Sequence, residues 1–252
     1  MARSFSDISK LCVSTSQART TLSPMCRHSK SCVLLGGDST AWSKLTPLAP
    51  PAWLDEQLTL FREAAEAAAV GNRSRAIEFL GYMKSQEMRV WFEEHGQFSG
   101  KIRAEYLSLP NPKPGAQSLD PVRSPARFEK QVFHRDAYTC RYCGLKLLAK
   151  ETLVAFEQAV GPQYFRTRGT NAQQHGIVHA FKIVADHVFP HKYGGKTSLE
   201  NLVSACPSCN YGKYWYTTEQ MGIDDPLSRQ PSPFEWSGLA SLVTGLRSHA
   251  LP

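Results

Sequence analysis

The chain has 252 residues, of which 42% are hydrophobic and 20% charged, and its formal net charge is +7. This length accommodates one large domain or two small ones, and the hydrophobic fraction is sufficient for a packed core. No run of 18 or more apolar residues is present, so we expect no membrane-spanning helix. The positive charge suits a polyanionic partner, although many proteins without such a partner are also basic.

Residues 1–52 contain Ser, Thr, Pro and Gly without a sustained hydrophobic period, so we expect little order there. The first twenty residues lack the apolar core of a secretory signal. We therefore expect a cytoplasmic protein whose cysteines remain reduced.

Residues 53–100 are expected to form a helical hairpin, with one helix over 53–70 and a second over 73–95. The first segment is rich in Ala and Glu, which favour helices. Its apolar residues recur at helical spacing, at Leu54, Leu58, Phe61 and Ala65. The hairpin could be a packing element, or its apolar face could form a homodimer.

Residues 101–127 are interpreted as a linker and domain boundary, because five prolines fall within 108–126. Neither a helix nor a central strand tolerates proline at that density.

Residues 128–216 are expected to form a second domain, beginning with a short helix that leads into a tight turn at Cys140. Residues 150–180 extend the domain as an insertion, with a helix over 150–160. Strands are expected at 181–185 and 202–206, followed by a helix that starts near residue 207. The remaining residues, 217–252, are predicted to be a tail with a short amphipathic helix.

Two histidines in the insertion, His175 and His179, have the i, i+4 spacing of a helical metal pair. The segment around them looks more like a strand than a helix, so we expect no metal site there.

Four of the seven cysteines form two C-x-x-C pairs, Cys140 with Cys143 and Cys206 with Cys209. A disulfide framework is disfavoured by the odd cysteine total, by the chain length and by the lack of a secretory signal. Paired C-x-x-C turns in a reducing compartment instead predict one closed, structural Zn²⁺ site.

Three further residues are the candidates for catalysis. Asp186 and His187 end the first expected strand, and Asn210 follows the last cysteine. A hairpin followed by a helix would bring Asp186 near Asn210, and two oxygen ligands suit Mg²⁺ or Mn²⁺. His187 would point to the other side of its strand, where an imidazole can take a proton from water. Cleavage of a phosphodiester needs both functions.

These residues, with Gly194-Gly195, Asn201-Leu202 and Lys213, resemble the motif of the HNH endonuclease family. The resemblance covers about residues 128–216 and implies a ββα-metal fold that cleaves DNA and leaves 5′-phosphate ends. It also implies roles for particular residues: His187 as general base, Asp186 and Asn210 as ligands of a divalent cation, and Asn201 as a brace of the loop. Lys213 would contact a phosphate, and Lys192 is a second candidate for that contact.

The sequence thus predicts an α+β protein: a zinc-stapled ββα-metal HNH domain behind a helical N-terminal region. The predicted activity is hydrolysis of DNA phosphodiester bonds with one divalent cation. Two alternatives stay open: a zinc-dependent nucleic-acid-binding module without catalysis, and a ribonuclease with the same site.

Overall fold

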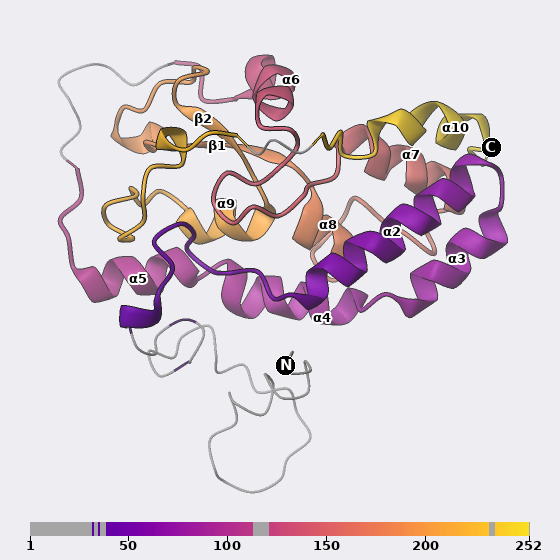
Figure 1. Cartoon of the computed structure of the whole chain (residues 1–252), viewed down its shortest axis with the longest axis horizontal. Helices are drawn as coiled ribbons and strands as arrows, with labels where there is room; N and C mark the ends of the chain where they lie inside the picture. Colours follow the sequence, from indigo (N-terminus) through magenta and orange to yellow (C-terminus); the bar gives the residue numbers. More distant parts are fainter. Residues whose placement is uncertain (1–31, 33–34, 36–38, 113–120, 232–234, 252) are drawn as a thin grey trace, which may run out of the picture.

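The computed structural model describes residues 32, 35, 39–112, 121–231 and 235–251. The helices of the N-terminal part are η2 (Ser39–Ala41), α2 (Trp53–Ala69), α3 (Arg73–Tyr82), α4 (Ser85–Trp91), the π-helical turn η3 (Phe92–Gly96) and α5 (Ser99–Leu107). The central elements are α6 (Ala126–Arg135), α7 (Lys150–Val160), α8 (Gly176–Phe181), β1 (Val184–His187), η4 (His191–Tyr193), β2 (Leu202–Ala205) and α9 (Pro207–Lys213). The chain ends with η5 (Pro226–Ser228), η6 (Ala240–Leu242) and α10 (Val243–Ser248). In Figure 1, α2, α3, α7 and α10 form one end of the molecule, and β1, β2 and α6 lie toward the other.

The first two long helices, α2 and α3, form an antiparallel hairpin joined by a short turn. Asn72 begins α3, and its side chain accepts a hydrogen bond from the backbone nitrogen of Arg75 at 3.2 Å. The apolar face of α2 is buried inside the chain, where Phe61 packs against Phe156 and Phe165 at centroid distances of 4.9 and 5.5 Å. This face therefore offers no argument for a dimer.

The segment expected to be one helix over 73–95 is divided in the structure into α3, α4 and η3. Lys84, at the break, donates its backbone N–H to Gln57 Oε1 at 2.7 Å. The break lets α4 pack closely on α8, since a Cβ on Gly176 would lie only 2.1 Å from the carbonyl oxygen of Ser85. Tertiary packing therefore overrides the helical period of the sequence here.

Two expectations of irregular structure differ from what the structure shows. Residues 39–52, for which we expected little order, include the buried side chains of Thr46 and Leu48. The remainder of 1–52, apart from residues 32 and 35, lies outside the described residues. The expected linker starts within α5, which continues to Leu107 and packs on α9.

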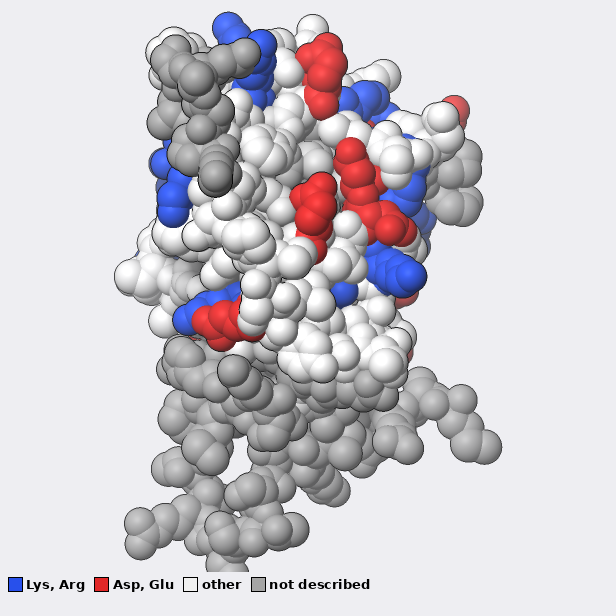
Figure 2. Space-filling model, turned by 90° about the vertical axis from the view of Figure 1, so that its left-hand side faces the viewer, with Lys and Arg blue, Asp and Glu red and all other residues white. Residues whose placement is uncertain are grey.

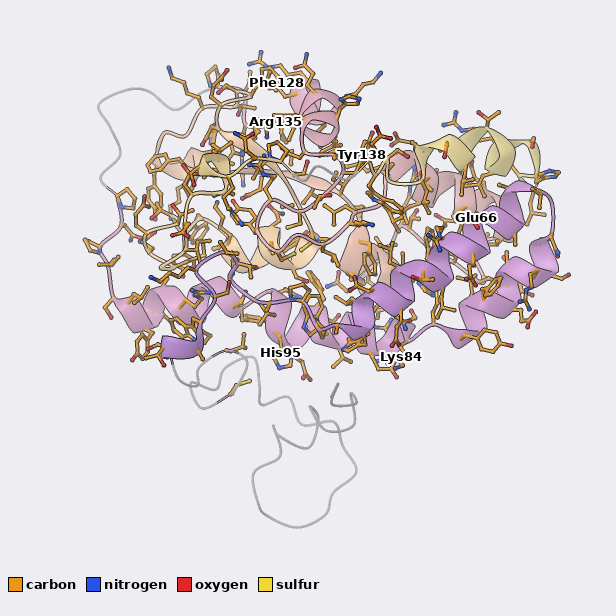
Figure 3. All side chains as sticks on the ribbon, viewed as in Figure 1. Glu66, Lys84, His95, Phe128, Arg135 and Tyr138 are labelled. Atoms are coloured by element: carbon orange, nitrogen blue, oxygen red, sulfur yellow. The ribbon has the colours of Figure 1, made fainter. Side chains whose placement is uncertain are left out.

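The two strands pair antiparallel, with Val184 opposite Ala205 and His187 opposite Leu202. Together with α9 they form the predicted ββα unit, and α6 covers β2. Arg135, at the end of α6 (Figure 3), donates to the carbonyl oxygens of Leu199 and Leu202 at 2.8 and 2.7 Å.

The strand-like interpretation of the segment around His175 and His179 was wrong, because residues 176–181 form the helix α8. The helix starts with His175, whose Nδ1 accepts a hydrogen bond from the Ile177 nitrogen at 3.3 Å. All six residues of α8 are buried, so it lacks the polar face by which a surface helix is recognised. β1 consequently begins at Val184 rather than at residue 181.

The predicted helix over 150–160 is confirmed as α7, and the short C-terminal helix as α10. α10 packs on α7 and α2, which places the end of the chain beside the hairpin. Among the helices that the structure describes, none is long and apolar enough to cross a membrane.

Candidate functional site

The four cysteines of the two C-x-x-C pairs lie together. Their sulfur atoms are all within 4.8 Å of one another, and the Sγ atoms of Cys143 and Cys206 are 3.8 Å apart. In a tetrahedral zinc site with Zn–S bonds of about 2.3 Å, neighbouring sulfurs are separated by roughly 3.8 Å. The cluster therefore fits the predicted structural Zn²⁺ ion.

The protein surroundings favour ionisation of Cys140, whereas hydrogen bonds with Cys140 raise the pKa of Cys143 and of Cys209 well above the usual value. Burial opposes ionisation of Cys140, but hydrogen bonds with the thiols of Cys143, Cys206 and Cys209 outweigh it and lower the pKa of Cys140 well below its usual value. The hydroxyl of Thr46 lies 3.4 Å from Cys209 Sγ. Thiolate is the form that binds zinc.

The tight turn that carries Cys140 and Cys143 also reaches the end of β1. Tyr142, which is buried, donates its hydroxyl to Asp186 Oδ2 at 2.6 Å. The turn that carries Cys140 and Cys143 and the strand that bears Asp186 are thereby joined by a hydrogen bond to a charged acceptor, which is stronger than a neutral one.

Asp186 is a buried carboxylate with a cation beside it. Lys213 Nζ lies 3.3 Å from the same Oδ2 atom and donates to the backbone oxygen of His187 at 2.7 Å. Burial raises the pKa of Asp186 above its ordinary value, whereas the Lys213 charge and the Tyr142 hydroxyl act in the opposite direction. Burial and the Asp186 charge in turn raise the pKa of Tyr142 well above its usual value.

Lys213 does not lie where a phosphate contact requires it. The residue is fully buried, and its ammonium group is directed at Asp186 and the backbone of β1. Lys213 lies in the last turn of α9 and forms an internal ion pair with Asp186. Asn210, one turn earlier on the same helix, is partly exposed.

His187 lies on the adjacent position of β1 and is partly exposed. Its Nε2 atom is 2.9 Å from the hydroxyl of Thr197, which is buried. The ring also lies edge-on to His191, at a centroid distance of 5.8 Å. Two neighbours from the loop between the strands thus fix the orientation of the imidazole.

Asn201 connects the two ends of that loop. Its Oδ1 accepts from the backbone nitrogen of Phe189 at 2.8 Å, and its Nδ2 donates to the carbonyl oxygens of Phe189 and Lys196 at 3.0 and 2.9 Å. The loop is so tight at Gly195 that a Cβ there would lie 1.9 Å from the Phe189 oxygen. The loop that carries Thr197 is therefore rigidly held against the strands.

Lys192 is exposed at the surface of η4, and its Nζ lies 3.8 Å from the centre of the Trp215 ring. Sequence reasoning missed Tyr142 and Thr197, both of which contact the predicted site residues. Tyr142 stands between two zinc ligands, so its position contained a usable signal. For Thr197 the residues alone gave no such signal.

Comparison with known proteins agrees with this geometry. Residues 177–214, which run from α8 to the residue after α9, match the family model described as HNH endonuclease. No curated protein and no solved structure matches the chain. The predicted α+β fold class, with a small sheet and a four-cysteine cluster, is confirmed.

Proposed function

We propose, from the HNH endonuclease match over residues 177–214, that the protein is a metal-dependent endonuclease that hydrolyses DNA phosphodiester bonds. The observation that carries the proposal is the arrangement of Asp186, His187 and Asn210 on one zinc-stapled ββα unit. A module that only binds nucleic acid needs none of these three side chains.

His187 is the proposed general base. It is the partly exposed member of the Asp186–His187 pair, and the bond to Thr197 fixes its ring. The imidazole accepts a proton from the attacking water, a function that histidine performs well near neutral pH. Thr197 acts through His187 and is therefore a positioning residue.

Asp186 and Asn210 are the proposed holders of a Mg²⁺ or Mn²⁺ ion. Both side chains offer hard oxygen atoms, which these cations prefer. Within the described part of the chain, the contacts of the Asp186 side chain with Tyr142 and Lys213 are made by Oδ2, so Oδ1 can serve as the ligand. When bound, the cation would stabilise the negative charge that develops on the phosphate oxygens.

The zinc cluster positions this site. Cys209 and Asn210 are neighbours on α9, and Tyr142 joins the first zinc-binding turn to Asp186. Lys213 supplies the positive charge that favours ionised Asp186 despite its burial. The role of the cluster is therefore to hold the two proposed metal ligands, which come from different elements, in place.

The test is nicking of supercoiled plasmid DNA in Mg²⁺ or Mn²⁺ by the zinc-loaded protein and by His187→Ala. We expect the variant to lose about 10²- to 10⁴-fold in rate while it still binds DNA, since that is the usual contribution of a general base. His134→Ala, which removes an exposed histidine on α6, is the matched control and should nick at the parent rate. If the parent and His187→Ala bind DNA equally and neither nicks it, the protein is a binding module. Faster cleavage of a competing RNA would instead establish a ribonuclease.

A further inference from the structure

Large aromatic side chains stand at the surface immediately after α9. Tyr214 is 55% exposed and Trp215 is 37% exposed. Their ring centroids are only 3.7 Å apart, with an interplanar angle of 39°. We call this pair the aromatic platform. Adjacent exposed aromatic rings commonly mark a binding surface.

The backbone holds the platform in a constrained conformation. Tyr214 has φ +53°, in a region that residues with a side chain seldom occupy. Its nitrogen donates to the Asn210 oxygen at 3.0 Å, and the nitrogen of Tyr216 donates to the Lys213 oxygen at 2.9 Å. Strained backbone of this kind tends to occur where function requires it.

A cation lies next to the platform, and the short helix η4 that carries it also contacts the proposed general base. Lys192 Nζ is 3.8 Å from the centre of the Trp215 ring. Its neighbour in η4, His191, has its ring 5.8 Å from that of His187. The platform is also tied through Tyr214 to Asn210, a proposed metal ligand. The platform therefore follows directly on the helix that carries Asn210 and contacts the short helix that carries His191.

We propose that the aromatic platform stacks the unpaired bases of single-stranded DNA, which makes DNA with unpaired nucleotides the substrate class of this site. The inference rests on the proposed function and narrows its substrate. Bases stack on aromatic rings independently of sequence, whereas a duplex hides its base faces. Lys192, whose Nζ lies over the Trp215 ring, would move off that ring and pair with a phosphate when a base stacks there.

The two signs of charge are mixed on one end of the molecule. On the end of the molecule drawn in Figure 2, Lys and Arg interleave with Asp and Glu. A protein partner could also cover two aromatic rings, but the nearby lysine favours a nucleic acid strand.

The experiment measures binding by fluorescence anisotropy, with His187→Ala as the parent so that no hydrolysis interferes. The probes are a labelled oligothymidine, a duplex of the same length and an oligouridine. Trp215→Ala and Tyr214→Ala should weaken oligothymidine binding by roughly 5- to 100-fold, the usual effect of losing one stacked base, and change duplex binding much less. Trp215→Phe, which keeps an aromatic ring, should bind nearly as well as the parent.

Tyr82→Ala is the matched control, since Tyr82 is 61% exposed on α3, an element that carries none of the proposed site residues. The proposal is overturned if the alanine variants bind oligothymidine like the parent, if duplex binding falls equally, or if oligouridine is preferred. It is also overturned if the parent binds no strand. Because binding is measured without cleavage, failure of the unsubstituted protein to nick plasmid DNA would contradict the nuclease proposal and leave this binding result unaffected.

Discussion

At the scale of single residues, the site depends on keeping Asp186 charged in a buried position. Burial of a carboxylate is costly unless donors and a cation surround it. Tyr142 and Lys213 supply these, one from the zinc-binding turn and one from α9. The same two contacts fix which carboxylate oxygen remains for a metal.

We expect Tyr142→Phe to destabilise the fold by about 1–3 kcal/mol, because it leaves a buried charged acceptor without one donor. The pKa of Asp186 should rise further, since the Tyr142 hydroxyl lowers it. Urea unfolding measures the first effect and the Mg²⁺ dependence of nicking the second. Tyr138→Phe, four residues earlier in the chain and partly exposed, is the control. Equal stability of the two variants would show that the Tyr142 hydroxyl contributes little.

The sequence predicted the positions of residues best where the spacing along the chain is itself characteristic of a metal site. The two C-x-x-C pairs predicted one cluster of four sulfurs, because few sites other than metal sites use that spacing. The structure places the four sulfurs together. The inward direction of Lys213 could not be predicted, since it depends on how α9 lies on β1. Thr197 could not be identified for the same reason.

At the scale of elements, the loop between β1 and β2 sets the position of His187 through Thr197. Asn201 bridges the loop, and Gly195 allows its close approach to Phe189. The site therefore depends on loop geometry as well as on the strands.

Gly195→Ala should destabilise the protein by about 1–3 kcal/mol and slow nicking, because its Cβ would meet the Phe189 backbone. Gly81→Ala on α3 is the control, since a Cβ there meets nothing within 4 Å and alanine favours a helix. Unfolding in urea compares the two. A Gly195→Ala protein as stable and active as the control would show that the loop tolerates displacement.

The π-helical turn η3 packs against α9 and buries His95 (Figure 3). Among the described residues, neither ring nitrogen of His95 has a hydrogen-bond partner. Burial lowers the pKa of His95 to about 4, below its ordinary value of 6.5. Between pH 4 and 6.5, His95 is therefore neutral in the folded state and protonated in the unfolded state.

Stability should consequently fall as the pH is lowered from 6.5 to 4, by about 3 kcal/mol from this group alone. His95→Leu removes the titrating group and should flatten that part of the profile. Urea unfolding of both proteins across this pH range, with zinc held constant, is the measurement. Identical profiles would mean that His95 is protonated in the folded protein.

Prediction of elements succeeded where hydrophobic period and end signals agreed, as in α7 and β2, whereas β1 begins three residues later than expected. It failed for α8, where Ile177 and Val178 favour a strand but the segment is buried on every side. A short apolar run does not distinguish a buried helix from a buried strand. The division of residues 73–95 likewise follows from contacts with α8, which no local pattern contains.

At the scale of the whole molecule, the N-terminal segments pack directly on the ββα unit and its four-cysteine cluster. Arg103 of α5 donates to the carbonyl oxygens of Thr46 and Met221 at 2.7 and 2.9 Å. Thr46 in turn contacts Cys209 of the four-cysteine cluster. α5 approaches α9 so closely that a Cβ on Gly100 would lie 2.1 Å from the Gly212 oxygen. Loss of the proposed zinc ion should therefore destabilise the N-terminal segments as well as the ββα unit.

We expect one zinc ion per chain, and Cys206→Ser should bind less zinc and unfold at a lower temperature. Four ligands from two distant turns close a long loop, and a structural zinc ion stabilises the fold directly. Metal analysis and thermal unfolding provide the test, with Cys32→Ser as the control outside the cluster. A Cys206→Ser protein with full zinc content would contradict the four-sulfur site.

In the proposed mechanism, Asp186 and Asn210 share a catalytic cation beside His187. The most direct test of this arrangement is the rate of plasmid nicking as Mg²⁺ is raised, measured for the zinc-loaded parent and for Asn210→Ala. We predict that the variant needs at least about tenfold more Mg²⁺ for half-maximal nicking, or loses the activity, in line with the loss of a metal ligand. Superimposable Mg²⁺ curves for the two proteins, or nicking that persists without a divalent cation beyond zinc, would contradict it.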